Sequence, residues 1–139
     1  MRGFSLIVAT LLCASAASAQ GGDAWSGTAA QGVIEGSVTS SDGKAELGAS
    51  CSLNQADDKS GLSIYVNKVS PKGHVSIRVD DGAPMEFDLV QGAVAPDAAG
   101  RDALFEAMIA GNRAEVALED GQTFSFSLAR SGIYLKPCL

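Results

Sequence analysis

The sequence predicts a mainly β protein, an antiparallel β-sandwich or partly open barrel with one short α-helix, closed by one disulfide. Three observations predict this fold class. Apolar and polar residues alternate along several short segments, Asp-Gly turn pairs separate those segments, and two cysteines remain once an N-terminal leader is removed. Alternation with a period of two is typical of strands that have one buried and one solvated face.

The first twenty residues, "MRGFSLIVATLLCASAASAQ", have the pattern of a secretory signal peptide. Arg2 is followed by an apolar run over 4–12 and by the small residues of 17–19, which predict cleavage after Ala19. The apolar run is too short to span a bilayer. We therefore expect residues 1–19 to be removed and the protein to be periplasmic or secreted. Cys13 offers an alternative as a lipidated residue, but Leu12 before it is larger than such sites accept.

Cleavage leaves Cys51 and Cys138, and an even number of cysteines in an exported protein predicts a disulfide. The two residues are 87 positions apart. In the chain-entropy model, closing a loop of this size stabilises the folded state by about 4 to 5 kcal/mol. A cysteine next to the end of the chain would then hold a terminus that otherwise frays.

Residues 20–139 have the length of one domain with one core. The Gly- and Ala-rich segment 20–31 is expected to be a flexible lead-in, and residues 32–139 form the β-rich domain. Trp25 either docks on the domain, the commoner outcome for a lone tryptophan, or is exposed as a contact residue.

The strands are predicted by alternation and by turns. Segment 33–53 forms two strands joined at Asp42-Gly43, a pair that accepts the positive φ of a tight turn. Segment 61–69 places Leu62 and Ile64 on one side, and segment 74–89 contains two strands joined at Asp81-Gly82.

The segment 95–116 changes to helical spacing. Leu104, Phe105 and Met108 recur on one face, so we expect a helix from near Asp97 or Arg101 to Ala110, ended by Gly111-Asn112 and packed on the sheet. A hairpin follows over 114–129, and a last short strand over 132–139 carries Cys138.

The charge balance excludes some partners. The formal net charge is −6 and becomes −7 when Arg2 leaves with the leader. No polybasic patch is present, so neither nucleic acid nor an anionic membrane surface is expected as a partner.

Catalytic and cofactor signatures are not found in the sequence. His74 is the single histidine and is expected to be an exposed loop residue, because metal and catalytic sites require several convergent groups. No serine lies in a G-x-S-x-G elbow, and there is no phosphate-binding or dinucleotide-binding glycine motif. We therefore expect no enzyme, no cofactor and no metal.

Paired carboxylates occur at 57–58, 80–81 and 119–120, where turns are predicted. A weak calcium site at one of these turns is an alternative to a purely structural role.

The candidate partner-contact residues are charged surface residues. Asp80 and Asp81 lie at a predicted hairpin tip, and Arg78, Arg101 and Arg113 are the cations that an anionic partner would meet. The competing interpretation is a mixed solvated surface that keeps the protein soluble.

The chain resembles the invasion-associated locus B family of bacterial exported proteins. The resemblance rests on "CSLNQ", "GLSIYVNK", "VSIRVDDGAPMEF", "ALFEAMIAGNRAEV" and "GQTFSFSLARSGIYLKPC", in that order, over 46–138. The middle cysteine pair typical of that family is absent from 87–100. The resemblance implies a non-enzymatic β protein of the envelope, associated with host-cell invasion, and it assigns no binding residue.

The sequence thus favours an exported protein-binding module whose protein partner is unknown. A periplasmic lysozyme inhibitor is the alternative, because such inhibitors are small disulfide-closed β proteins and one group has an "SGxxY" loop. Here "SGIY" at 131–134 resembles that loop with a different spacing. An acidic protein also suits a cationic enzyme electrostatically.

Overall fold

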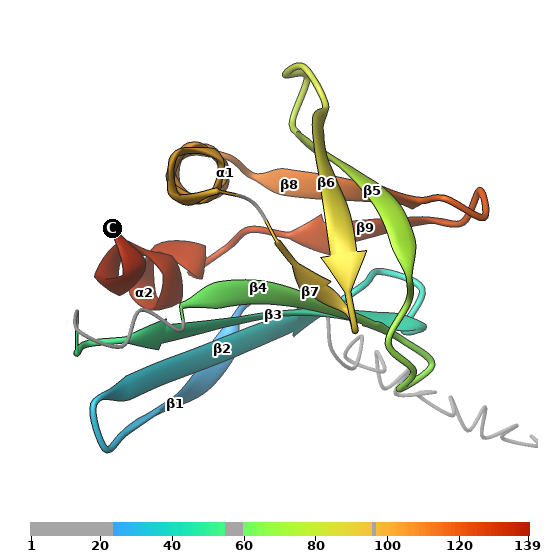
Figure 1. The fold of residues 1–139 in the computed structure, drawn as a ribbon. Coiled ribbons are helices and arrows are strands. Elements are labelled where there is room, and N and C mark those ends of the chain that lie inside the picture. Colours follow the sequence, from blue (N-terminus) through green and yellow to red (C-terminus); the bar gives the residue numbers. More distant parts are fainter. Residues whose placement is uncertain (1–23, 55–59, 96) are drawn as a thin grey trace, which may run out of the picture.

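The computed structural model describes residues 24–54, 60–95 and 97–139. The predicted signal peptide lies outside the described residues. Within them the fold is mainly β, with one antiparallel sheet of nine strands that is not closed and two short helices (Figure 1). The strands are β1 (Ser26–Ala30), β2 (Val33–Thr39), β3 (Ala45–Ser52), β4 (Gly61–Val66), β5 (Gly73–Val79), β6 (Met85–Val90), β7 (Ala93–Val94), β8 (Arg113–Leu118) and β9 (Thr123–Ser127).

The strand order is β1-β2-β3-β4-β7-β6-β5-β8-β9, with every pair antiparallel. The chain runs as a meander through β1–β4, crosses to β5 and returns through β6 to β7 beside β4. After α1 it adds β8 and β9 on the other side of β5. The sheet bends strongly, so that β1–β4 face β5, β6, β8 and β9 across the core, with β7 joining the two halves between β4 and β6 (Figure 1).

The sheet edges approach each other at one corner without pairing as strands. The backbone N–H of Trp25 donates to the carbonyl of Ala129 at 2.9 Å, and the backbone N–H of Ser41 donates to the carbonyl of Ser125 at 2.9 Å. Trp25 is fully buried, and its indole N–H donates to the carbonyl of Ser127 at 3.1 Å. The expected docking of Trp25 is therefore confirmed.

The predicted hairpins are present with the predicted faces inward. Leu62, Ile64, Val75 and Ile77 are buried, as are the inward residues of the last hairpin: Val116, Leu118, Phe124, Phe126 and Leu128. At the first turn, Gly43 has a φ of +74°, and the Asp42 carboxylate accepts a bond from the Ser40 hydroxyl at 2.6 Å. Alternation and turn chemistry thus predicted which residues of these strands face the core.

Helix α1 (Ala98–Ala110) confirms the predicted helix. Asp97 caps its start, because the Asp97 carboxylate accepts a hydrogen bond from the backbone N–H of Gly100. Leu104, Phe105 and Met108 are buried, so the apolar face packs into the core as expected.

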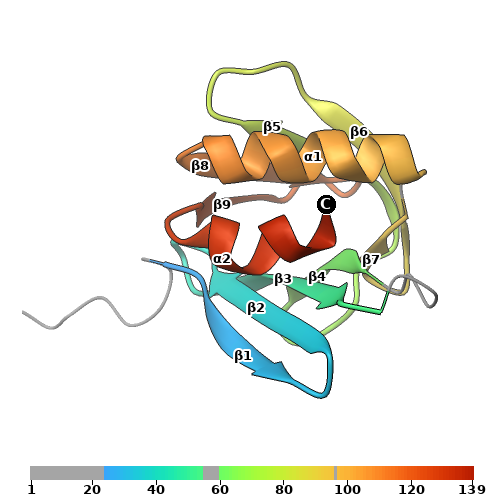
Figure 2. The same ribbon diagram turned by 90° about the vertical axis from the view of Figure 1, so that its left-hand side faces the viewer.

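The predicted last strand over 132–139 is wrong. Residues Ser131–Leu135 form a second helix, α2, and Lys136–Cys138 form a turn of 3₁₀ helix. The Ser131 hydroxyl donates to the carbonyl of Met108 at 3.1 Å, which ties α2 to α1, and Figure 2 shows the two helices side by side in front of the bent sheet. A strand could not place Tyr134 and Leu135, adjacent in sequence, on the same buried side, whereas a helical turn does.

The predicted lead-in over 20–31 also differs in its described part. Residues Ser26–Ala30 form β1, paired with β2 from Ser26 opposite Ser37 to Ala30 opposite Val33. All five residues of β1 are exposed, which explains why no apolar alternation marks this strand in the sequence.

Candidate functional site

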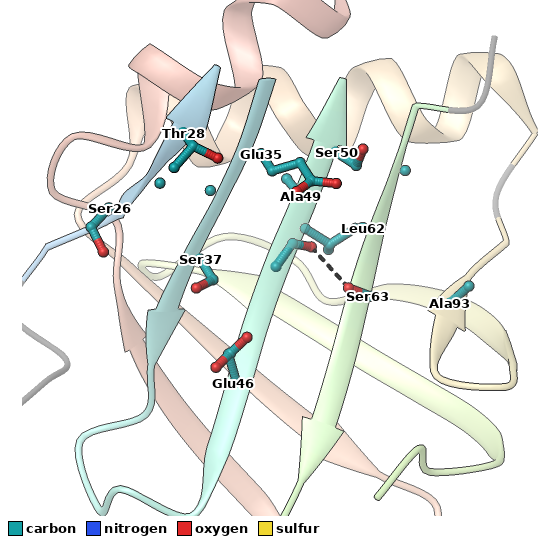
Figure 3. A pocket seen from close by; sticks show the side chains of 14 residues that line it. Ser26, Thr28, Glu35, Ser37, Glu46, Ala49, Ser50, Leu62, Ser63 and Ala93 are labelled. Atoms are coloured by element: carbon teal, nitrogen blue, oxygen red, sulfur yellow. Dashed lines mark hydrogen bonds between the residues drawn. The ribbon is translucent and has the colours of Figure 1, made fainter. Parts of the chain in front are cut away.

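Strands β1–β4 present an outer face that is lined with small polar side chains. The register places Ser26 opposite Ser37 and Thr28 opposite Glu35, and residues directly opposite in antiparallel strands share a face. The pairing continues across the sheet, where Ser50 of β3 lies opposite Glu35. Ser63 of β4 is in line with Ser37 of β2, because both lie opposite the same residue of β3. Figure 3 shows these side chains on one side of the four strands.

This outer face is hollowed into a groove of about 490 Å³. The hollow forms where glycines on this face have no side chain to fill the space. A Cβ added to Gly48 would lie 3.2 Å from the Ser63 hydroxyl oxygen. The same hydroxyl lies 3.5 Å from the carbonyl oxygen of Gly48. Glu35 and Glu46 stand at its two ends (Figure 3). Neither carboxylate forms an ion pair with another residue of the described ranges. The groove therefore offers hydroxyls and two carboxylates to whatever enters it.

The two edges of the sheet differ in how they are covered. Carbonyls of Ser125, Ser127 and Ala129, at or just after β9, accept hydrogen bonds from Ser41 and Trp25, so the β9 edge is occupied within the molecule. Strand β1 borders the groove and has β2 as its partner among the described strands. Its other side is an edge with five exposed residues, "SGTAA", and no charge or proline.

His74 lies within strand β5 and not in the predicted loop, and it is half-exposed, close to two carboxylates of the neighbouring β6. Its Nε2 lies 2.5 Å from Glu86 Oε2, and its Nδ1 lies 3.5 Å from Asp88 Oδ1. The hydrogen bond to Glu86 raises the pKa of His74 above its usual value, with a further contribution from Asp88 and partial opposition from desolvation. This cluster favours a protonated imidazole at a sheet surface.

The shallow hollow beside His74 has a volume of about 340 Å³ and is lined, among the described residues, by acidic, apolar and glycine residues without a hydroxyl or thiol group. In the part of the chain that the structure describes, no group of three or more His, Cys, Asp or Glu side chains is arranged to hold a metal ion. The Asp57-Asp58 pair lies outside the described residues.

Three of the predicted partner-contact residues lie together near the end of β5, where they make contacts within the protein. Arg78 donates to Glu115 of the adjacent strand at 3.1 Å, and Arg113 Nε donates to the Ser125 hydroxyl. Asp80 has a φ of +50°, and its carboxylate accepts from the backbone N–H groups of Asn112 at 3.1 Å and Arg113 at 3.0 Å. Asp80 therefore holds the chain where α1 passes into β8, which is a structural role.

Asp81 is exposed in the turn that follows β5. Arg101 lies near the other end of α1 from this group, with its side chain 16% exposed and its Nε 3.4 Å from Asp102 Oδ1. The structure therefore does not bring all five predicted residues to one surface. Neither the groove nor the β1 edge was predicted from the sequence, because Ser, Thr and Gly are also the residues expected on an ordinary solvated face.

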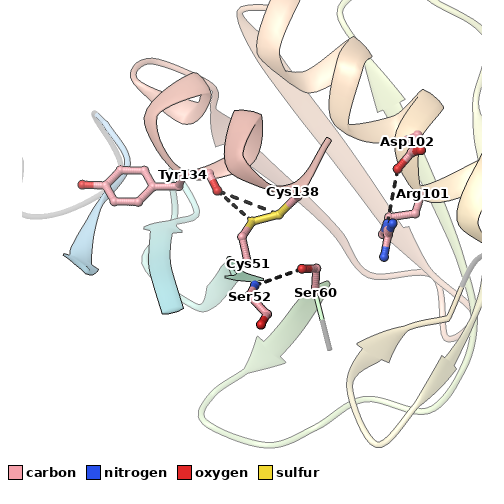
Figure 4. The surroundings of a disulfide bond; sticks show 7 residues. All are labelled: Cys51, Ser52, Ser60, Arg101, Asp102, Tyr134 and Cys138. Carbon is pink, nitrogen blue, oxygen red and sulfur yellow. Dashed lines mark hydrogen bonds and ion pairs between the residues drawn. A yellow bond between two sulfur atoms is a disulfide. The ribbon is translucent and has the colours of Figure 1, made fainter. Parts of the chain in front are cut away.

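Cys51 and Cys138 lie at disulfide distance, with their Cα atoms 5.0 Å apart (Figure 4). Cys51 is fully buried on β3, and the carbonyl oxygen of Tyr134 lies 2.9 Å from its sulfur. The pair brings the 3₁₀ turn of Lys136–Cys138 against the last residues of β3. The pairing predicted from the cysteine count is consistent with this geometry.

Tyr134 fixes α2 against the sheet. A Cβ at Gly36 would lie 2.3 Å from the Tyr134 ring, so the ring packs directly on the backbone of β2. The same ring stacks against Trp25 with the centroids 6.4 Å apart. In the "SGIY" segment Ser131 and Tyr134 are both buried, so their side chains are core residues.

No helix in the described ranges combines the length and the apolar character needed to cross a membrane. No curated protein and no solved structure matches the chain. A family model does match: the YfjT model aligns with residues 23–134, which cover β1–β9, α1 and most of α2. The described fold is thus almost entirely contained in the matched region, and the chain belongs to the YfjT family.

Proposed function

We propose that the protein is a non-enzymatic binding module, and that an extended segment of a partner protein adds as a strand to the edge of β1. The observation that carries this proposal is the contrast between the two sheet edges. The β9 edge is occupied by Ser41 and Trp25, whereas β1 has all five residues exposed. Exposed edges are usually protected by charge, proline or bulges, and "SGTAA" has no charge and no proline.

Strand addition would also bring the partner to the groove. Main-chain hydrogen bonds would supply affinity, and alternate side chains of the added strand would lie on the outer face beside Ser26 and Thr28. Glu35 at that end of the groove would favour a basic or hydroxyl-bearing side chain in the partner. The groove thereby adds selectivity to an otherwise sequence-tolerant edge.

The non-enzymatic part of the proposal is supported by the surroundings of His74. This imidazole faces two carboxylates on a half-exposed sheet surface, and its hollow is lined without a hydroxyl or thiol side chain among the described residues.

The setting of the module is proposed from the sequence. The leader pattern of 1–19 supports export to the periplasm or beyond, and the distance between Cys51 and Cys138 suits an oxidising compartment. The bend of the sheet supports classing the fold as a partly open barrel. The resemblance to the invasion-associated locus B family remains a prediction, and with it an association with the envelope or with host-cell invasion.

The lysozyme-inhibitor alternative has no support from the "SGIY" segment, because Ser131 and Tyr134 are buried and not available to an enzyme. The acidic surface alone would have to bind the cationic enzyme, so lysozyme is included in the test as a separate ligand.

The test is capture of partners from envelope and host-cell extracts by the oxidised protein, with edge variants as bait. Thr28→Lys places a charge on β1, and Thr123→Lys is the matched control on the covered β9 edge, since both threonines are exposed. We expect a protein partner captured by the wild type and by T123K but not by T28K, and slowed amide hydrogen exchange at 26–30 in its complex. Capture that T28K does not reduce, or no specific capture, would refute the proposal; salt-sensitive lysozyme binding would favour the inhibitor.

A further inference from the structure

A second hollow lies on the same outer face, beyond the groove and away from β1. It has a volume of about 610 Å³ and shares Glu46 with the groove. The side chains that carry the following argument come from the ends of β2, β3 and β4 and from the turns beside them: Thr39, Lys44, Glu46, Tyr65, Asn67 and Lys68. This combination of a ring, a carboxylate, a hydroxyl, an amide and two ammonium groups differs from the serine-lined groove.

The floor of the hollow is a row across three strands. Thr39 of β2 lies opposite Glu46 of β3, and Glu46 lies opposite Tyr65 of β4. Residues directly opposite in antiparallel strands have their Cβ atoms about 4.5 to 5.5 Å apart. Tyr65 is 39% exposed, so its aromatic ring is accessible to a ligand. In the same row, the Glu46 carboxylate can accept hydrogen bonds and the Thr39 hydroxyl can both donate and accept them.

Lys68 occupies a position where the backbone favours glycine. The turn after β4 has Asn67 at a φ of +50° and Lys68 at +65°, closed by reciprocal hydrogen bonds between Val66 and Val69. Two other turns of the protein repeat this pair of positive φ values, and both have glycine second: Gln31-Gly32 and Gln91-Gly92. Such turns prefer Asn-Gly, so the lysine is held against its conformational preference.

The Lys68 ammonium has no hydrogen bond or ion pair with another described residue. Lys44 lies in the adjacent turn, where the backbone N–H of Asn67 donates to its carbonyl at 2.8 Å and the Asp42 carboxylate lies close to it. Lys44 and Lys68 thus place two positive charges at the hollow in a protein whose net charge is −6. Glu46 on the floor disfavours a densely charged anion such as a polyphosphate. The ligand that fits has hydroxyl groups for Glu46, Thr39 and Asn67, an apolar ring face for Tyr65, and an isolated negative charge for the lysines.

We propose that this hollow binds an acidic glycan, a saccharide whose units carry carboxylate groups. The carboxylate of a sugar unit lies between Lys44 and Lys68, its ring face packs on Tyr65, and its hydroxyls donate to Glu46. This site is separate from the β1 edge, and it gives the protein a polysaccharide ligand in addition to a protein partner.

The test is binding of the oxidised protein to an array of carboxylated and neutral glycans, followed by titration calorimetry. Tetragalacturonate is the acidic probe and maltotetraose is the neutral control. We expect K68G to bind the acidic glycan at least tenfold more weakly while melting at the same or a higher temperature, because glycine relieves the turn. K44Q is the second variant and is expected to weaken binding similarly, and K72Q, which removes the same charge outside the hollow, is expected to leave it unchanged.

Three results would overturn the proposal: no carboxylated glycan bound in the array, equal affinity for the neutral probe, or unchanged binding by both K68G and K44Q. The edge variant T28K is expected to bind the glycan normally, so failure of the strand-addition proposal would be seen separately.

Discussion

Replacing Cys51 and Cys138 together with alanine tests how the domain is held closed. The double variant is expected to keep the fold, because Tyr134 and Leu135 still anchor α2 in the core, but to lose a large part of its stability. Alanine is preferred to serine because Cys51 is fully buried and a hydroxyl there would need a partner.

The expected magnitude follows from the size of the loop. A cross-link between residues 87 positions apart removes chain entropy from the unfolded state that corresponds to about 4.6 kcal/mol at 25 °C. Truncating the buried Cys51 side chain adds roughly 1 kcal/mol for the small cavity. A loss of about 5 kcal/mol is a third or more of the roughly 5 to 15 kcal/mol that stabilises a typical domain.

Urea unfolding followed by tryptophan fluorescence measures this loss. Trp25 is the single tryptophan, is fully buried and stacks on Tyr134, so its emission reports the corner where both ends of the domain meet. The urea midpoint is expected to fall, and the slope m is expected to rise, because the unfolded chain without a cross-link exposes more surface.

The wild-type protein treated with a reductant is the control, since it lacks the cross-link but keeps both side chains. It is expected to be less stable than the oxidised protein and slightly more stable than the double variant. If oxidised and double-variant proteins unfold at the same urea concentration with equal slopes, the cross-link does not constrain the unfolded chain and the reasoning is wrong.

Three further predictions concern the fold and one surface cluster. Gly36→Ala is expected to destabilise by about 1 to 3 kcal/mol in urea unfolding, because the new Cβ overlaps an aromatic ring, whereas Gly61→Ala, which meets open space, is expected to change stability by about 0.5 kcal/mol or less. His74 is expected to titrate by NMR above its usual pKa; its contribution to stability is then fully present below about pH 6.5 and is lost as the pH rises through the raised pKa, and a His74→Gln variant should lack this dependence. Asp80→Ala is expected to lower the melting temperature, with a cost of about 0.5 to 1.5 kcal/mol for the hydrogen bonds lost to the exposed backbone N–H groups of Asn112 and Arg113, whereas Asp81→Ala, in the exposed turn, is expected to leave it nearly unchanged.

Most of the sheet could be predicted from the sequence, because buried strand faces leave an apolar residue at every second position. The same holds for α1, where the Asp97 cap and the spacing of its apolar residues agree. Strand β1 has no such pattern, because all of its residues are exposed and pairing with β2 rather than burial holds it in place. Helix α2 has only five residues, too few to show a helical period, and its contacts are with residues distant in sequence, such as Met108 and Gly36.

The candidate sites were less predictable than the fold. Charged residues at a hairpin tip suggested a contact surface, but Asp80 and Arg113 bond to neighbouring elements instead. The groove depends on glycines that face outward on adjacent strands, which becomes visible only when the register is known. The unusual position of Lys68, where glycine is preferred, could have been predicted only by recognising that its turn is of the same type as the Gln31-Gly32 turn.

The position of Trp25 has a consequence for how the chain folds. Its indole N–H donates to the carbonyl of Ser127, 102 positions later in the sequence. Cys51 lies at disulfide distance from Cys138, 87 positions later. The contacts that close the core therefore join early and late segments of the sequence. Contacts between distant residues form slowly, because the entropy of closing a long loop is lost before the contacts can stabilise it. A chain synthesised from its N-terminus has β1–β4 available before β9 and α2. The domain therefore reaches its native core only after its last residues have been delivered.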